Sequence, residues 1–62
     1  MCLSTIYKGT KAPENIVMGN VQRIDIDGDQ ILLTDLMDRQ VVVIGQLVMV
    51  DLVGAMAIVR EF

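Results

Sequence analysis

The sequence predicts an all-β fold, a small β-barrel of about six to seven short strands that spans residues 1–62 as one domain and forms a homodimer. Apolar runs of strand length, rich in β-branched residues, recur between Gly, Asn and Asp turn signals. No segment shows the 3.6-residue apolar period of an amphipathic helix. The chain has 62 residues, of which 53% are hydrophobic, and so small a core cannot hide that much apolar surface. We therefore expect a partner.

The first third of the chain contains three predicted strands. Residues 2–8 alternate two sets of β-forming side chains, which predicts a strand at the very start. A polar connection with the only proline follows. Residues 16–18 and 21–26 then form two further strands, because Gly19-Asn20 signals a turn or bulge between them.

The clearest local signal is a hairpin around Asp27-Gly28. Both residues tolerate the positive φ that a two-residue type I′ turn requires. A turn at these two residues places Ile24 opposite Ile31, with both side chains on one face.

The second half of the chain continues with short apolar strands. Residues 34–39 form a loop or one helical turn, in which Asp35 and Asp38 are turn formers with solvated carboxylates. Three strands follow, over residues 41–44, 47–50 and 56–59. The first two are apolar on both faces and need a second layer, which a second copy of the chain supplies most simply across a two-fold axis.

A membrane span over residues 41–59 is the alternative to these strands. Gln46 and Asp51 lie inside that stretch, and Asp near a helix centre costs roughly 3 kcal/mol on insertion. Gly45 and Gly54 also divide it into pieces of strand length. We therefore predict no membrane contact. The lack of a recognisable signal segment, together with a single cysteine that cannot form an internal disulfide, favours a cytoplasmic protein.

Composition excludes most catalytic and nucleic-acid functions. The chain has no histidine, so it cannot use a Ser-His-Asp or Cys-His catalytic mechanism. We therefore predict that it is not an enzyme. Five Lys and Arg residues oppose eight Asp and Glu residues, and the five are scattered along the chain. We therefore expect no nucleic-acid partner, because phosphate binding needs a basic face.

Cys2 is the one side chain with distinctive reactivity. The simplest interpretation is a small buried hydrophobe in the first strand. Position 2, however, puts the thiol beside the terminal nitrogen, so amine or amide nitrogen and thiolate sulfur can chelate one metal ion. One terminus supplies only two or three donors, whereas two termini in a dimer supply an N2S2 set. Such donors in a plane suit Ni(II) or Cu(II).

Several segments together resemble the CooT family. They are the opening Met1-Cys2-Leu3-Ser4-Thr5-Ile6-Tyr7, the Ile-Asp-Gly-Asp hairpin, Leu33-Thr34-Asp35-Leu36, and Val50-Asp51-Leu52-Val53 before a last apolar strand. The family is associated with maturation of nickel-dependent carbon monoxide dehydrogenase, and some relatives are labelled predicted RNA-binding proteins. The resemblance covers essentially the whole chain, and the Met-Cys-Leu opening is its most specific part.

The resemblance implies a homodimeric barrel of SH3-like character that binds Ni(II) through Cys2. It also implies an accessory protein that supplies nickel to carbon monoxide dehydrogenase or a related nickel enzyme. Two alternatives stay open: an RNA-binding module of the small-barrel type, and a structural or adaptor subunit in which Cys2 is buried.

Overall fold

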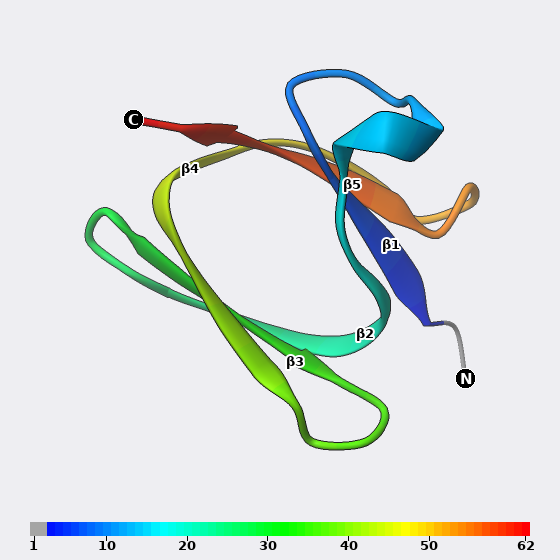
Figure 1. The fold of residues 1–62 in the computed structure, drawn as a ribbon, viewed down its shortest axis with the longest axis horizontal. Coiled ribbons are helices and arrows are strands. Elements are labelled where there is room, and N and C mark those ends of the chain that lie inside the picture. The colour runs from blue at the N-terminus through cyan, green and yellow to red at the C-terminus, as the bar shows by residue number, and fades with distance from the viewer. Residues whose placement is uncertain (1–2) are drawn as a thin grey trace.

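A computed structural model describes residues 3–62 and contains five β-strands in one closed sheet, shown in Figure 1. The strands are β1 (Ser4–Lys8), β2 (Ile16–Asp27), β3 (Gln30–Asp35), β4 (Gln40–Asp51) and β5 (Met56–Glu61), and a short 3-10 turn, η1 (Pro13–Asn15), precedes β2. The prediction of an all-β barrel is confirmed. The prediction of six to seven strands is wrong.

The strand count is lower because two glycine signals bend a strand without ending it. β2 runs through Gly19 and Asn20, where Asn20 adopts the left-handed region at φ 53°. β4 runs through Gly45, where a Cβ atom would collide with the backbone carbonyl oxygen of Arg60. Glycine at position 45 therefore allows β5 to approach the bend closely.

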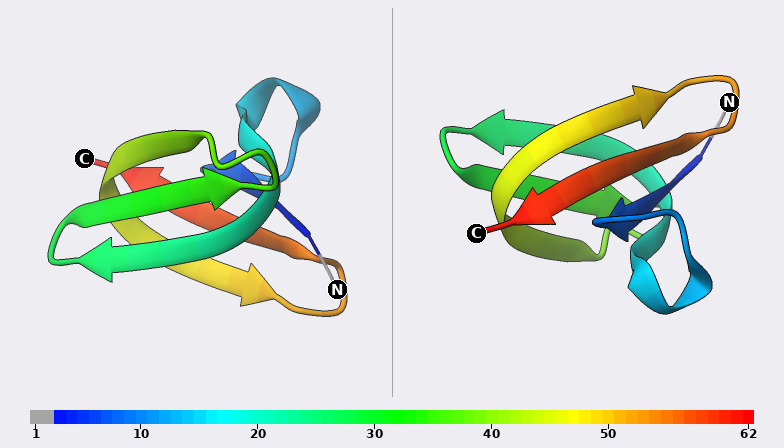
Figure 2. Two further views of the ribbon diagram at one scale, coloured as in Figure 1. Left: turned by 90° about the horizontal axis from the view of Figure 1, so that it is seen from below. Right: turned by 90° about the horizontal axis from the view of Figure 1, so that it is seen from above.

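The two bent strands each belong to two layers of the barrel. The first half of β2 pairs with β1 and its second half with β3. In the same way, the first half of β4 pairs with β3 and its second half with β5. We call β2–β1–β5–β4 the β1 layer and β2–β3–β4 the β3 layer; Figure 2 shows them from opposite sides.

The barrel closes through a parallel pair. Every pair of strands that are adjacent in the chain is antiparallel, so the first and fifth strands run in the same direction. β1 and β5 accordingly pair in parallel, from Thr5 opposite Met56 to Lys8 opposite Val59. β1 thereby lies in the middle of the β1 layer, between β2 and β5.

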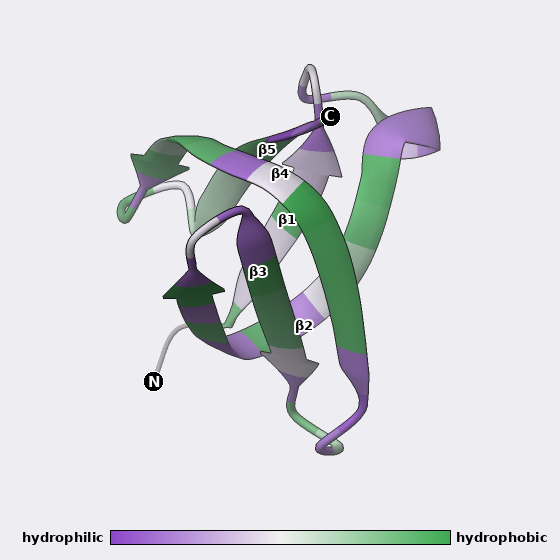
Figure 3. Cartoon of the chain, turned by 90° about the vertical axis from the view of Figure 1, so that its left-hand side faces the viewer, coloured by the Kyte–Doolittle hydropathy of each residue, from purple (hydrophilic) through white to green (hydrophobic). Residues whose placement is uncertain are grey.

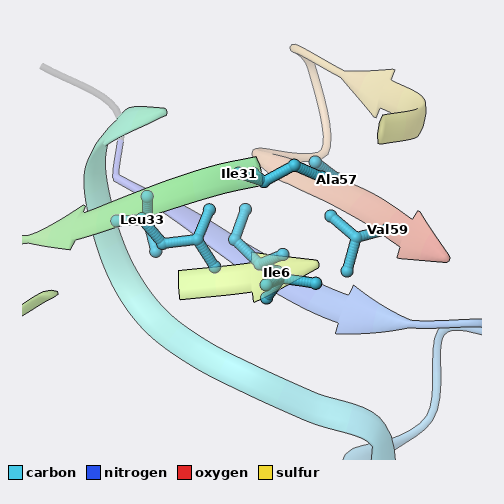
Figure 4. Close-up of a cluster of buried hydrophobic side chains, with 7 residues drawn as sticks. Ile6, Ile31, Leu33, Ala57 and Val59 are labelled. Atoms are coloured by element: carbon cyan, nitrogen blue, oxygen red, sulfur yellow. The ribbon is translucent and has the colours of Figure 1, made fainter. Parts of the chain in front are cut away.

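The core fills the space between the two layers and draws on all five strands (Figure 4). Ile6, Ile31, Leu33 and Val59 are fully buried. The core cluster contains Ile6, Val21, Ile31, Leu33, Val43, Ala57 and Val59. Alternate residues of each strand point inward, which is the period-2 pattern that the sequence predicts.

The predicted hairpin exists, but its turn lies one residue further along, at Gly28 and Asp29. Gly28 has φ 59° and is the turn residue with positive φ, as expected when glycine takes the first central position. Ile31 therefore pairs with Ile26 instead of Ile24. Moving a two-residue turn by one position shifts the register by two, which keeps the same side chains inside.

β4 is apolar on both faces, as predicted, and Figure 3 shows it as largely hydrophobic. Val43 is buried, whereas its neighbours Val42 and Ile44 point outward and are 55% and 46% exposed. Residues 41–59, the stretch weighed as a membrane span, form strands and turns. Within residues 3–62, no helix has the length and apolarity to cross a bilayer.

Candidate functional site

The predicted metal ligand, Cys2, lies outside the described residues, so the candidate site is approached from the first strand. β1 begins at Ser4, two positions after Cys2. Two residues of extended chain span at most about 7 Å. The surroundings of Ser4 are therefore the part of the structure on which a site at Cys2 would depend.

The start of β1 is held from both sides. Ser4 pairs with Val21 of β2, and Thr5 pairs with Met56 of β5. The Thr5 amide also donates a hydrogen bond of 3.0 Å to the carbonyl oxygen of Ala55. Figure 2 shows β1 between these two neighbouring strands. A group attached to this end of β1 thus starts from a well-anchored backbone.

The turn between β4 and β5 borders the start of β1. Its conformation depends on Asp51, whose carboxylate accepts a 2.8 Å hydrogen bond from the Gly54 amide, and on Ala55, which has φ 53°. Leu52 and Val53 at its tip are 82% and 100% exposed. Two apolar side chains therefore face solvent in the turn whose last residue, Ala55, binds β1.

Residues 3–62 contain no group of three or more His, Cys, Asp or Glu side chains placed to hold a metal ion. The single cysteine of the sequence is Cys2, and there is no histidine. The described part of the chain therefore adds no preformed donor cluster to the thiol at position 2.

Asp35 and Asp38, the two turn carboxylates, take different roles, and the prediction that both are solvated is wrong for Asp35. Asp35 is only 3% exposed. Its Oδ1 accepts hydrogen bonds of 2.9 Å from the amides of Met37 and Arg39, and its Oδ2 accepts one of 2.8 Å from the Arg39 guanidinium. Asp38 is exposed, with φ 63°, and accepts a 3.3 Å hydrogen bond from Gln22.

The environment of Asp35 makes it a structural anion. Burial by itself raises the pKa of Asp35, but the Arg39 amide, the Arg39 side chain and the Met37 amide stabilise the carboxylate, and the net effect lowers its pKa below the ordinary value. All of these partners belong to the turn between β3 and β4. A shallow pocket of about 480 Å³ lies beside it, lined by Met18, Gly19, Asn20, Asp35, Arg39, Gln40 and Val41. Because both oxygens of Asp35 accept hydrogen bonds from Met37 and Arg39, the carboxylate holds the turn between β3 and β4 together.

Within residues 3–62, two of the five basic side chains form ion pairs with carboxylates. Arg39 contacts Asp35 at 2.8 Å, and Arg23 contacts Asp25 at 3.0 Å on the outer face of the β3 layer. The first pair lies in the turn between β3 and β4, and the second lies on β2. Lys8 and Arg60 border a separate pocket at the opposite end of β1.

Comparison with known protein families gives a match. A family model described as the CO dehydrogenase accessory protein CooT matches residues 1–60. The chain belongs to the CooT family. The resemblance that the sequence suggested is thereby confirmed, over almost the whole length of the chain. No curated protein matches the chain.

The CooT match includes both the described barrel and the segment before it. Cys2 lies within the matched residues, and so does all of β5 except its last residue, Glu61. The family description supports an accessory role toward CO dehydrogenase. Sequence reasoning predicted the turn that contains Asp35 but missed the burial of its carboxylate, because Asp in a loop normally signals a solvated side chain.

Proposed function

We propose that this CooT-family chain is a homodimeric nickel-binding accessory protein that holds Ni(II) through Cys2. In this proposal it supports nickel delivery to carbon monoxide dehydrogenase or a related nickel enzyme and catalyses no reaction itself. The observation that carries the proposal is the family match over residues 1–60, which includes the one thiol of a chain without histidine. The client enzyme is inferred from the family description, and the metal is inferred from the sulfur and nitrogen donors near position 2.

Ni(II) fits the donors that this segment offers. Thiolate sulfur and nearby main-chain nitrogen are ligands that Ni(II) accepts in a planar arrangement. The anchoring of Ser4 and Thr5 between β2 and β5 supports the proposal, because a metal site is more precise when its ligands are attached to rigid elements. One thiolate gives an incomplete set, so we propose that two copies share the ion. The SH3-like character of the barrel stays a prediction.

The exposed apolar residues support the homodimer. Val48, Met49 and Val50, which are consecutive in β4, are between 38% and 52% exposed. A lone soluble domain rarely leaves that much contiguous apolar surface uncovered. A second copy would cover it, and would also bring a second Cys2.

Native mass spectrometry with and without added NiCl2 tests the proposal. We expect a dimer that takes up one Ni(II), with release of protons, because an ordinary thiol has a pKa of about 8.5 and must lose its proton to bind. Occupancy should therefore fall as the pH is lowered from 8 to 6. A monomer without nickel uptake would contradict the proposal.

Two further measurements separate the proposal from its alternatives. Cys2 in the folded protein should react readily with a maleimide, and Ni(II) should protect it. A thiol that stays unreactive until the protein unfolds would instead favour an adaptor with a buried cysteine. A salt-dependent shift of RNA at micromolar protein would favour the RNA-binding module.

A further inference from the structure

The outer face of the β1 layer carries an apolar row that crosses all four of its strands. Ile16 of β2 pairs with Tyr7 of β1, Tyr7 pairs with Ile58 of β5, and Ile58 pairs with Met49 of β4. Residues directly opposite each other in a sheet project to the same side. We call Ile16, Tyr7, Ile58 and Met49 the apolar row.

The apolar row faces away from the core. Ile6, Ala57 and Val59, which flank Tyr7 and Ile58 along β1 and β5, are at most 1% exposed and belong to the core cluster. Because side chains alternate along a strand, Tyr7 and Ile58 point outward. The two ends of the row, Ile16 and Met49, are 48% and 38% exposed.

A β-bulge in β4 completes the row. Leu47 pairs with Val59, but Met49 pairs with Ile58, so one extra residue, Val48, is inserted between them. Without this bulge, strict alternation from the inward-pointing Leu47 would turn Met49 inward as well. The bulge therefore aims Met49 outward and leaves Val48 52% exposed beside it.

Charged residues border the row but do not interrupt it. Arg60 lies opposite Gln46 on one side of the row, and Asp51 lies two residues beyond Met49 on the other. The centres of protein interfaces are depleted of charge in the same way, with polar residues at the rim.

From this arrangement we infer that a second copy of the chain packs on the apolar row, sheet against sheet, about a two-fold axis parallel to β1. The inference rests on the homodimer of the proposed function and names its surface. A two-fold axis parallel to β1 leaves the direction of the strand unchanged, so the two β1 strands would run in the same direction. They would lie about 10 Å apart, which is the spacing of packed sheets. Both Ser4 ends would then lie at one end of the interface, which a metal site shared by two Cys2 residues needs.

A dimer interface of standard size needs only part of the exposed surface. A standard interface buries about 800 Å² on each partner, which is about a fifth of the 4204 Å² that the described chain exposes. The apolar row and its border occupy one of the two faces of this small barrel. A second copy is thus the occupant that places two β1 strands next to each other at the centre of the interface.

The outer face of the β3 layer is the alternative surface, and it fits less well. Val42 and Ile44 are exposed there, but the ion pair between Arg23 and Asp25 lies on the same face. This layer does not contain β1, which pairs with β2 and β5. A dimer through it would leave the two Ser4 ends on opposite outer sides.

Charge substitutions test the assignment by sedimentation velocity. The double variant Ile16→Glu/Met49→Glu places like charges against each other, and its dimer dissociation constant should rise roughly 100-fold or more. The matched control is Val42→Glu, which adds the same charge to β4 at a residue that is 55% exposed on the other face. The control should stay dimeric. Circular dichroism confirms that each variant is folded.

Cross-linking tests the direction of the axis. In a Cys2→Ser background, Thr5→Cys places a single thiol near the start of β1, on the same side as Tyr7. A short bismaleimide should join two such chains, whereas the same thiol introduced by Val42→Cys should remain unlinked. Efficient linking through position 42 alone would overturn the inferred arrangement.

The outcomes separate this inference from the proposed function. Loss of the dimer in Val42→Glu but not in the double variant would overturn the surface and leave the homodimer standing. A dimer that survives in all variants would also overturn it. A wild-type chain that is monomeric with and without Ni(II) would overturn both.

Discussion

Replacing Gly45 by alanine should strongly destabilise the barrel. The added Cβ would overlap the carbonyl oxygen of Arg60 and lie 2.8 Å from its carbonyl carbon and 2.9 Å from the Cα of Glu61. All three atoms belong to the backbone, so no side chain can rotate away. β4 and β5 must therefore separate at the bend.

The size of the effect follows from what the separation disrupts. Overpacking of this kind costs about 1–3 kcal/mol. Two hydrogen bonds at the bend, from Gly45 to Asp29 (2.8 Å) and from Phe62 to Ile44 (2.9 Å), are also at risk, at about 0.5–1.5 kcal/mol each. A chain of 62 residues has a total stability of roughly 3–9 kcal/mol. The loss of about 2–6 kcal/mol is thus a large part of the whole.

Urea unfolding followed by circular dichroism measures this loss, at one fixed protein concentration because a dimer's stability depends on it. Gly19→Ala is the matched control, since Gly19 has no atom within 4 Å of the added Cβ and no positive φ. That variant should be neutral or more stable by up to about 1 kcal/mol. Equal stability of the two variants would refute the bent-strand account of β4.

Two further predictions concern the core and the buried carboxylate. Leu33→Ala removes a fully buried side chain and should cost about 2–5 kcal/mol, whereas Val53→Ala, at a fully exposed position, should change the unfolding free energy by less than about 0.5 kcal/mol; similar losses would contradict the assigned core. The lowered pKa of Asp35 stabilises the fold above the pKa of the unfolded carboxyl, about 3.9. This stability is lost as the pH falls through the lower folded pKa, so the wild type should lose stability between pH 5 and pH 2 more steeply than Asp35→Asn, and parallel unfolding curves would contradict that role.

Local patterns in the sequence predict the strands well but not their continuity. Period-2 alternation locates the inward-facing residues, including Ile31 and Leu33. The glycine signals are ambiguous, because Gly45 can equally end a strand or allow a bend where another backbone approaches. Only the long-range contact with β5 decides between the two, and that contact is not encoded in neighbouring residues.

The hairpin and the Asp35 turn show the same limit. Asp27-Gly28 and Gly28-Asp29 are both acceptable turns, and the choice depends on which register pairs the strands best. Asp35 signals a turn correctly, but its burial depends on Arg39 and on the amides that fold back onto it. Cys2 is proposed as a ligand from the sequence alone, because the reactivity of its thiol is a property of the residue type, and this assignment stays a prediction.

Calorimetric titration of Ni(II) into the wild-type protein and into Cys2→Ser tests the central claim most directly. The wild type should bind one Ni(II) per dimer and develop a sulfur-to-nickel charge-transfer absorption, because the thiolate is the proposed ligand. Cys2→Ser should lose both the high-affinity binding and the absorption while keeping its circular dichroism spectrum and its dimeric state. Unchanged nickel affinity in folded Cys2→Ser would contradict the account.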